Sequence, residues 1–180
     1  MTTTGKIAPK WVMLLLTFGL IYPLDRLTKH WIVAELAYGE RRVVIDGLFD
    51  LTHVRNPGGA FSFLADAAPE IRLAFFGVAA VLAIVMLLVF FWRLPPEETL
   101  AAAALGSILG GAVGNLTDRI LFGGEVIDFL NVHLTTTYTW PTFNVADSAV
   151  VVGVIILLVE TFLEERAVGA SKDLAETEGQ

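Results

Sequence analysis

Four stretches of the chain are rich enough in apolar residues to cross a membrane as helices. Residues 73–92 carry no charged side chain over twenty positions, and residues 99–117 carry none over nineteen. Each stretch is long enough to span a hydrocarbon core, which takes about 20 helical residues. The apolar runs 11–24 and 149–159 are shorter, at fourteen and eleven residues. These two span the membrane only if the polar residues beside them enter it; otherwise they lie on its surface or re-enter it.

We therefore expect four transmembrane helices, at about 9–34, 70–92, 98–121 and 143–163. Four crossings bring both termini to one side of the membrane. The ends of the first and third helices and the start of the fourth then meet at the opposite face. Polar side chains occur at each of these three places: Asp25, Lys29, Asn115, Asp118, Arg119, Asn144 and Asp147. Isolated structural charges have no reason to gather at one face, whereas the residues of a functional site do.

The loop between the first two helices is predicted to form a small β-sheet on the membrane, over about residues 40–66. In the sequence RRVVIDGLFDLTHV, two β-branched or aromatic runs flank Asp46 and Gly47, a pair typical of two-residue hairpin turns. The sequence RNPGGAFSF, which follows, favours a tight backbone path. Residues 131–142 are also rich in threonine and aromatic residues, so they either add to this sheet or lie at the membrane interface.

The composition is that of an integral membrane protein. The 180 residues are 55% hydrophobic and have a mean hydropathy of +0.67, values that a soluble domain rarely reaches. We expect residues 1–166 to form one membrane domain and the polar tail 167–180 to be disordered and solvated. The chain has no cysteine, which excludes disulfides, thiol catalysis and thiolate metal sites.

The distribution of basic residues does not determine which face of the membrane is cytoplasmic. The side that holds the termini has five Lys and Arg residues and the other side has seven, although basic residues should favour the cytoplasm. The counts become five and three if four residues are set aside as part of a site: Arg26, Lys29, Arg55 and Arg119. Composition alone therefore leaves the orientation open.

Asp128 and Asp147 are the candidate catalytic pair. Asn144 and Asp147 are three residues apart at a helix start, where an N-terminal cap is the favoured interpretation if they are taken alone. Asp128, taken alone, could equally be a residue of a turn or a residue of a site. Two carboxylates at one low-dielectric face, however, do not both ionise easily, so one keeps its proton. The pair then provides a base to activate water and an acid to protonate a leaving amine, as in an aspartic protease.

The polar residues of the first and third helices have structural alternatives. Asn115, Asp118 and Arg119 share one helix face, and Asp118 is expected to brace the site in an ion pair with arginine. Asp25 and Lys29 are one helical turn apart, and we expect a structural or lipid-facing role for them rather than catalysis.

Asn56 and Gly58 belong to the sequence RNPGGAF. Asn56 is either a turn residue or one whose amide holds an extended peptide backbone. Other chemistries fit the sequence poorly, because its three histidines form no HExxH motif and no serine lies in a G-x-S-x-G context. There is no P-loop and no dinucleotide fingerprint. We expect neither a metal nor a cofactor.

Taken together, these motifs resemble those of the lipoprotein signal peptidases, also called signal peptidase II. The matching sequences, in chain order, are DRLTK (25–29), NPGGAFSF (56–63), GGAVGNLTDRILFGGEVIDF (110–129) and FNVADS (143–148). The resemblance covers about residues 10 to 163, and the pattern GNxxDR…VxDF followed by FNxADS is highly specific. Gly59 occupies a position at which many members have alanine, a small change after which the motif is still recognisable.

The resemblance implies an aspartic endopeptidase of the bacterial inner membrane, with four transmembrane helices, a β-cradle, cytoplasmic termini and an active site near the outer leaflet. Its substrate would be a prolipoprotein that already carries diacylglycerol, cut before the lipidated cysteine, and globomycin-type peptides would inhibit it. The catalytic dyad of the family falls on Asp128 and Asp147. The other polar motif residues fall on Asp25, Lys29, Asn56, Asn115, Asp118, Arg119 and Asn144.

Two other functions remain open. A small proton-coupled carrier also uses intramembrane acids, but it should distribute them through the membrane depth, often within internal repeats, which this sequence lacks. A non-catalytic lipid-binding assembly factor would use the acids only to brace its fold. As partners we expect lipidated prolipoproteins and membrane lipids but no nucleic acid, and we expect a monomer.

Overall fold

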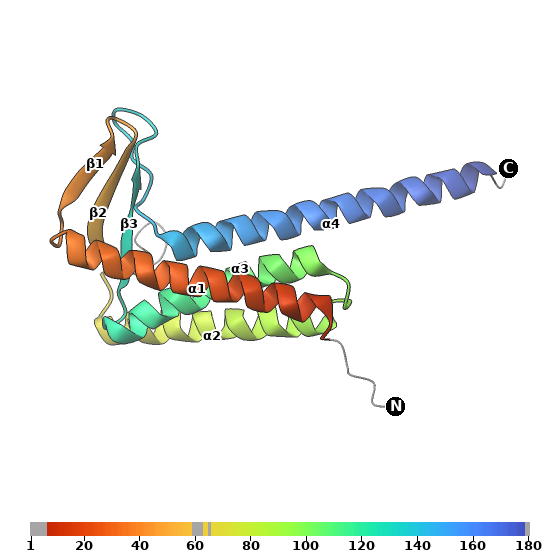
Figure 1. Ribbon diagram of the computed structural model, residues 1–180, viewed down its shortest axis with the longest axis horizontal. Helices are drawn as coiled ribbons and strands as arrows, with labels where there is room; N and C mark the ends of the chain where they lie inside the picture. Colours follow the sequence, from red (N-terminus) through yellow and green to blue (C-terminus); the bar gives the residue numbers. More distant parts are fainter. Residues whose placement is uncertain (1–6, 59–62, 65, 179–180) are drawn as a thin grey trace.

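The computed structural model describes residues 7–58, 63–64 and 66–178, and four long helices dominate it (Figure 1). The helices are α1 (Pro9–Glu35), α2 (Pro69–Arg93), α3 (Thr99–Leu121) and α4 (Val145–Glu178). All four are long and apolar enough to cross a membrane, α4 over Val145–Leu163. The prediction of an all-α membrane protein with four transmembrane helices is confirmed. Both shorter apolar runs become spans, because the polar residues at the sheet end of α1 and α4 complete them.

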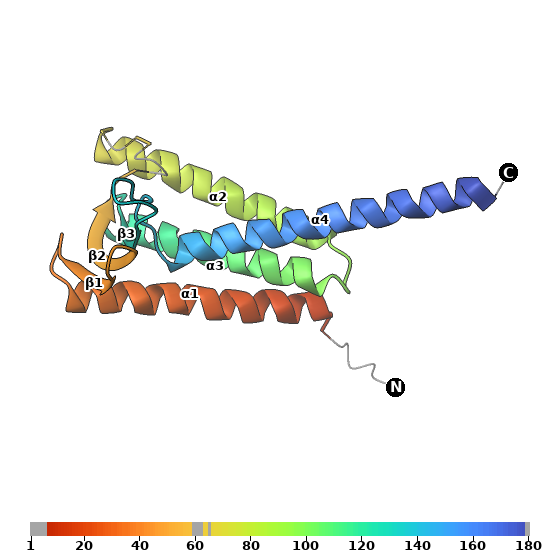
Figure 2. The same ribbon diagram turned by 90° about the horizontal axis from the view of Figure 1, so that it is seen from above.

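The last part of α4 differs from the disordered tail that the sequence predicted. The helix continues without a break to Glu178 and projects past the ends of the other helices (Figure 2). Residues 167–178 include three alanines and two glutamates, which are good helix formers, and no proline.

α3 is the central helix of the bundle, because α1, α2 and α4 all pack against it. Its glycines allow this close approach. A Cβ atom on Gly110 would lie 2.9 Å from the Cβ of Ile21 in α1, and one on Gly111 would lie 2.4 Å from the carbonyl oxygen of Ala146 in α4. Small residues take this role in membranes because helix association there depends on close packing rather than on the hydrophobic effect.

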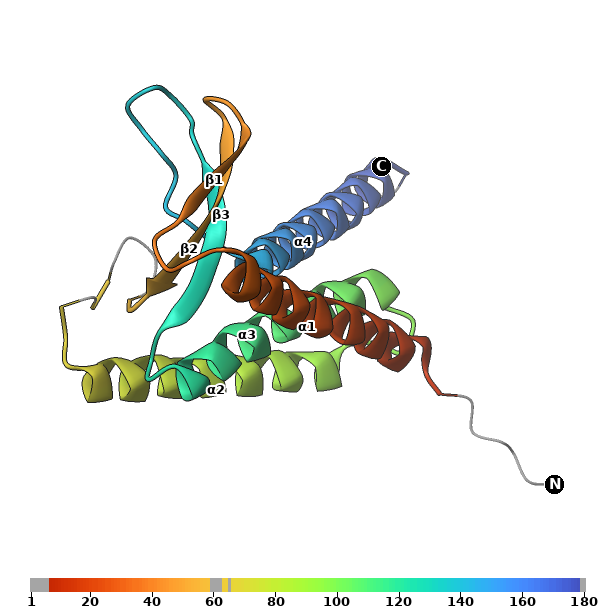
Figure 3. The same ribbon diagram turned by 60° about the vertical axis from the view of Figure 1, so that its left-hand side comes forward.

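A three-stranded antiparallel sheet stands across one end of the bundle, opposite to the start of α1 and the end of α4 (Figures 1 and 3). Its strands are β1 (Arg41–Ile45), β2 (Phe49–Asn56) and β3 (Val126–Val132), in the order β1-β2-β3. The predicted hairpin is present, but its turn has three residues rather than two, because Ile45 pairs with Phe49. Gly47 in this turn has a φ of +69°, which glycine adopts without strain.

The third strand comes from the segment between α3 and α4, so the sheet joins two distant parts of the chain. The sequence indicated strand character only over residues 131–142, whereas β3 begins earlier and contains Asp128. Residues 139–143 then return along the free edge of β3, where backbone hydrogen bonds of 2.8 and 3.1 Å join Phe143 to Leu130. Both sides of β3 are therefore paired near Asp128.

A small apolar cluster fastens the sheet to α1. Phe129 of β3 packs with Ile32 and Leu36, and all three side chains are buried. Successive residues of a strand point to opposite faces of the sheet. The burial of Phe129 against α1 therefore directs its neighbour Asp128 to the other face, where the candidate site lies.

Candidate active site

Asp128 and Asp147 line the same cavity, at the junction of the sheet with the helices. The cavity has a volume of about 910 Å³, and its walls come from β2, β3, α3, the start of α4 and residues 140–143. Asp128 enters it from β3 and Asp147 from the first turn of α4. Valines from both strands and from α4 contribute to the apolar part of its lining, together with Trp140 and Phe143. A chain that crosses the membrane four times thus carries two carboxyl groups in one partly apolar chamber.

Asn144 connects the two carboxyl groups. It is fully buried, its Nδ2 donates to Asp128 Oδ1 at 2.7 Å, and its backbone N–H donates to Asp147 Oδ2 at 3.1 Å. In return, Asn144 Oδ1 accepts a hydrogen bond of 3.0 Å from the backbone N–H of Asp147. This reciprocal arrangement is a capping box at the start of α4. Asp147 is therefore both a helix cap and a cavity residue, so the two interpretations that the sequence left open are compatible.

Asn56 supports the second oxygen of Asp128. Its Nδ2 donates to Asp128 Oδ2 at 3.0 Å, and its Oδ1 accepts from the backbone N–H of Gly58 at 3.0 Å. The strand register explains this contact: Val54 of β2 pairs with Asp128, and Asn56, two residues further, points to the same face. The side chain thus orients a carboxyl group and shapes the turn after β2. Residues 59–62 of the NPGGAFSF motif, Gly59 among them, lie outside the described residues.

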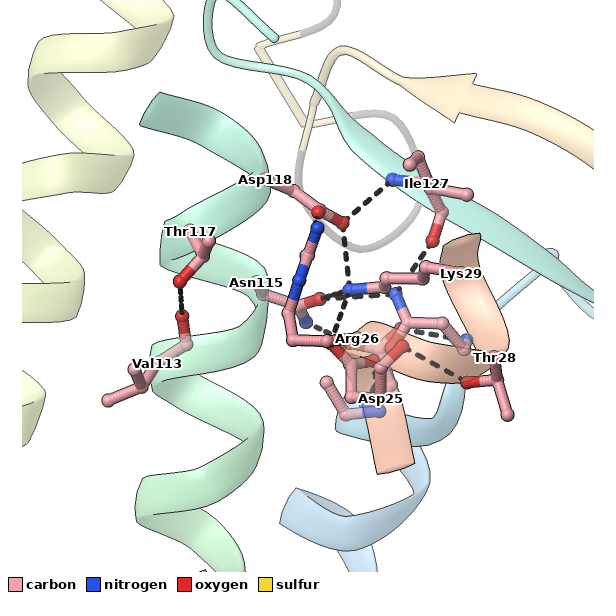
Figure 4. Close-up of polar contacts among 12 residues, drawn as sticks. Asp25, Arg26, Thr28, Lys29, Val113, Asn115, Thr117, Asp118 and Ile127 are labelled. Carbon is pink, nitrogen blue, oxygen red and sulfur yellow. Dashed lines mark hydrogen bonds and ion pairs between the residues drawn. The ribbon is translucent and has the colours of Figure 1, made fainter. Parts of the chain in front are cut away.

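Lys29 lies at the centre of an ion-pair network (Figure 4). Asn115 connects this network to Asp147 of the carboxyl pair. The side chain of Lys29 is fully buried, and Nζ lies 2.8 Å from Asp118 Oδ2, 3.0 Å from Asp25 Oδ2 and 2.8 Å from Asn115 Oδ1. An ammonium group has three N–H donors, so these contacts satisfy it, as a buried charge requires. The lipid-facing role considered for Lys29 is therefore wrong.

Asn115 and Asp25 link this network to the start of α4. Asn115 Nδ2 donates to Asp147 Oδ1 at 2.7 Å, while its Oδ1 accepts from Lys29. Asp25 Oδ1 accepts from the backbone N–H of Ala146 at 3.1 Å. One buried lysine thus fixes residues of three helices around Asp147.

Asp118 braces the site, but its arginine partner is Arg26 of α1 rather than the neighbouring Arg119. It is fully buried, forms an ion pair with Arg26, and accepts from the backbone N–H of Ile127 at 3.2 Å. Because Ile127 precedes Asp128, this last bond fixes the position of β3 and of its carboxyl group. From the sequence, Arg26 was set aside as a site residue only in the count of basic residues and was assigned no partner, since nothing in its spacing indicates one on α3.

Arg119 faces the cavity from α3. Its Nη2 lies 3.4 Å from the carbonyl oxygen of Gly58, and its guanidinium lies 4.7 Å from the ring centre of Phe76 in α2. The positive charge acts on Asp147 and Asp128 without an ion pair to either. The structure therefore brings all ten predicted site residues to one end of the helices. Asp25, Lys29 and Asp118 belong to the network, Asn144 is buried between the two carboxyl groups, and the other six line the cavity.

Asp128 holds a proton more tightly than an ordinary carboxyl group does. Burial raises its pKa from 3.8 to about 7, and the negative charge of Asp147 adds to this effect. The hydrogen bonds from Asn56 and Asn144 act in the opposite direction, because they stabilise the carboxylate. Near neutral pH the group is therefore able both to give and to accept a proton. Within the described part of the chain, no three His, Asp or Glu side chains are arranged to hold a metal ion.

The fold and this site define a multi-pass membrane protein with a pair of carboxyl groups buried at one end of its helices. The family description Signal peptidase (SPase) II matches residues 17–163. The Lipoprotein signal peptidase of Geobacter sulfurreducens is 50% identical to the chain over 143 residues, which are 79% of this chain and 87% of the relative. The protein of the same name from Pseudomonas aeruginosa is 39% identical over 163 residues, covering 91% and 92%. The chain belongs to the signal peptidase II family of peptidases, which confirms the resemblance found in its sequence.

Two solved structures of a bacterial membrane enzyme have the same fold. One superposes with a TM-score of 0.75 at 27% sequence identity, over 84% of this chain and 88% of the other. The second gives a TM-score of 0.72, also at 27% identity, over 82% and 91%. The chain is thus a multi-pass bacterial membrane protein with a known architecture.

Proposed function

We propose that this chain is the aspartic endopeptidase that removes the signal peptide from diacylglyceryl-modified prolipoproteins, cutting before the lipidated cysteine. Membership of a peptidase family, and relatives named lipoprotein signal peptidase, support this substrate class. One observation carries the chemistry: Asp128 and Asp147 line one cavity and are hydrogen-bonded to the same buried residue, Asn144. No observation favours the carrier or the assembly factor.

Asp147 is the base of the pair and Asp128 the acid. Asp147 accepts hydrogen bonds from the backbone N–H of Asn144 and from the side chain of Asn115, whose oxygen in turn accepts from the ammonium group of Lys29. Asp128 is more deeply buried and accepts from two neutral amides, and its pKa of about 7 allows it to keep the shared proton. Sequence patterns alone do not distinguish the base from the acid.

Hydrolysis then needs one water and two proton transfers. Asp147 takes a proton from the water, whose oxygen forms a bond to the scissile carbonyl carbon. Asp128 gives its proton to the leaving nitrogen as the carbon–nitrogen bond breaks, which releases an amine and a carboxylic acid. The proton on Asp147 returns to Asp128 directly or through the next water, and Asn144 keeps the two groups in register throughout.

The lipid part of the substrate reaches the site from the bilayer. Val150 and Val151 of α4 line the cavity, and Val151 is 56% exposed on the surface of a helix that spans the membrane. An acyl chain beside α4 is therefore continuous with the apolar wall of the chamber, while the peptide lies against Asn56, Gly58 and Arg119 on the sheet side. A soluble protease offers no such path.

The proposal includes an orientation. We place the protein in the bacterial inner membrane as a monomer, with both termini cytoplasmic and the sheet and cavity at the extracytoplasmic face. The resemblance to signal peptidase II supports this orientation. The structure is consistent with it, because the cavity lies at the end of the bundle opposite to the start of α1 and the end of α4 (Figure 1).

The test is cleavage of a purified lipidated prolipoprotein by variants of the pair. Asp128→Asn and Asp147→Asn each remove a group that gives or takes a proton, so turnover should fall by at least about a hundredfold. Asp46→Asn, an equal change at an exposed acid of the hairpin turn, should leave turnover unchanged. Near wild-type turnover in either folded variant of the pair would show that the assignment is wrong.

A further inference from the structure

A second polar cluster lies in the sheet, apart from the carboxyl pair, and the mechanism does not use it. Asp50 of β2 is fully buried, and its Oδ2 lies 2.5 Å from both Arg41 Nε and His133 Nε2. His133 Nδ1 lies 2.8 Å from the hydroxyl oxygen of Thr139. These four residues, the Asp50 cluster, join β1, β2 and the end of β3 to the segment 139–143.

The strand register explains why these side chains meet. Val43, Asp50 and Asn131 stand opposite one another across the three strands. Arg41 and His133 are each two residues away from this row, so their side chains point to the same face as Asp50. Burial by itself would raise the pKa of Asp50, but the hydrogen bonds from His133 and Arg41 outweigh it and lower the pKa. The carboxylate is therefore ionised at neutral pH and holds both partners.

The segment attached to this cluster forms one wall of the cavity. Residues 140–143 line the chamber that contains the carboxyl pair. At its inner end the segment runs directly into Asn144, the buried cap of α4. At its outer end it is held by the side-chain contact and the backbone bridge between His133 and Thr139. The position of the wall therefore depends on the sheet as well as on the helices.

We propose that Asp50, His133 and Thr139 are positioning residues that fix this wall for the substrate peptide, and that they determine substrate affinity rather than the rate of the chemical step. The inference rests on the proposed function. A wall that is fixed in advance lowers the entropic cost of binding. Because it touches the peptide away from the scissile bond, its contribution is equal in the ground state and the transition state. Loss of such uniform binding raises KM and leaves kcat unchanged.

The experiment compares kcat and KM of full-length variants on a synthetic diacylglyceryl-prolipoprotein peptide. Asp50→Asn should raise KM by about three- to tenfold and Thr139→Val by about twofold, the range expected for one hydrogen bond, with kcat within about twofold of wild type. Arg42→Gln is the matched control, because Arg42 neighbours Arg41 but its side chain contacts the exposed Glu35 rather than Asp50. It should change neither constant.

A second measurement does not depend on cleavage. Since the chain has no cysteine, a cysteine introduced by Thr137→Cys carries a spin label at one position only. The label should be more mobile in the Asp50→Asn background than in the wild-type background. An unchanged KM, a fall in kcat alone, or unchanged label mobility would overturn the proposal. If wild type fails to cut the peptide, the proposed function is wrong, and label mobility still decides whether the cluster holds the wall.

Discussion

Neutral amides, rather than charged groups, make the direct contacts to the carboxyl pair. Asn56, Asn115 and Asn144 donate to Asp128 or Asp147, whereas the buried lysine reaches the pair only through the oxygen of Asn115. A lysine in direct contact with both acids would keep both ionised, and neither would then hold a proton for the leaving amine. Amide donors orient the two groups and still leave one of them protonated near neutral pH.

The pKa of Asp128 predicts an alkaline limit to activity. Burial and the charge of Asp147 raise this pKa to about 7, and the acid of the pair acts only while it is protonated. Above pH 7, kcat/KM should therefore fall by about tenfold per pH unit. Asn56→Ala removes a donor that stabilises the carboxylate, so the pKa rises further and the alkaline limb moves to higher pH, by on the order of one unit.

The measurement is the pH profile of kcat/KM for wild type and for Asn56→Ala on the same lipidated peptide. The pH at which the alkaline limb begins does not depend on the overall activity of the variant. A less active variant therefore still shows whether the pKa of the acid has changed. A limb that moves to lower pH in Asn56→Ala would contradict the acid role of Asp128.

The helices follow from the sequence more directly than the sheet does. An uncharged run such as that of α2 determines a span locally, through length and hydropathy. β3 depends on pairing with β2, far earlier in the chain, so Asp128 remained open to interpretation as a turn acid. The partners of Asp118 and Asp50 were not predicted for the same reason. Strand register and helix rotation determine which side chains meet, and neither can be derived from the spacing of residues along the chain.

The contact between α1 and α3 should be sensitive to a single methyl group. A Cβ on Gly114 would lie 2.5 Å from Asp25 Oδ2, so Gly114→Ala must displace the partner of Lys29 or separate the two helices. Overpacking of this kind costs about 1–3 kcal/mol. We expect a lower thermal unfolding midpoint in detergent and a severalfold loss of kcat/KM.

Gly77→Ala in α2 is the matched control for this prediction. Apart from the local helix backbone, no atom of the described residues lies within 4 Å of a Cβ at that position. Alanine is also the better helix former, so the midpoint should be unchanged or higher. If both substitutions had the same effect on stability, the close α1–α3 contact would not be the cause.

The whole molecule separates its lipid-facing surface from its chemistry. α2 exposes large apolar side chains along its length. Among the described residues, the buried acids and Lys29 lie at the end of the bundle where the sheet stands (Figure 3), whereas Lys10 is buried at the other end, against the carbonyl oxygens of Phe91 and Leu94. Charges are costly in the bilayer centre, and this arrangement places them near an interface instead. Under the proposed function, the same arrangement would place the cavity between the acyl chain of a lipidated substrate in the membrane and its peptide outside it.

The proposed orientation predicts which parts of the chain are accessible from outside the cell. Asp46 lies in the β1–β2 turn and Glu97 in the α2–α3 connection, at opposite ends of the helices. In this cysteine-free chain, Asp46→Cys should react with a membrane-impermeant thiol reagent in spheroplasts of the expressing cells. Glu97→Cys should react only after the membrane is permeabilised. The reverse pattern would place the cavity on the cytoplasmic side, where it would not meet a prolipoprotein whose lipidated cysteine lies at the outer leaflet.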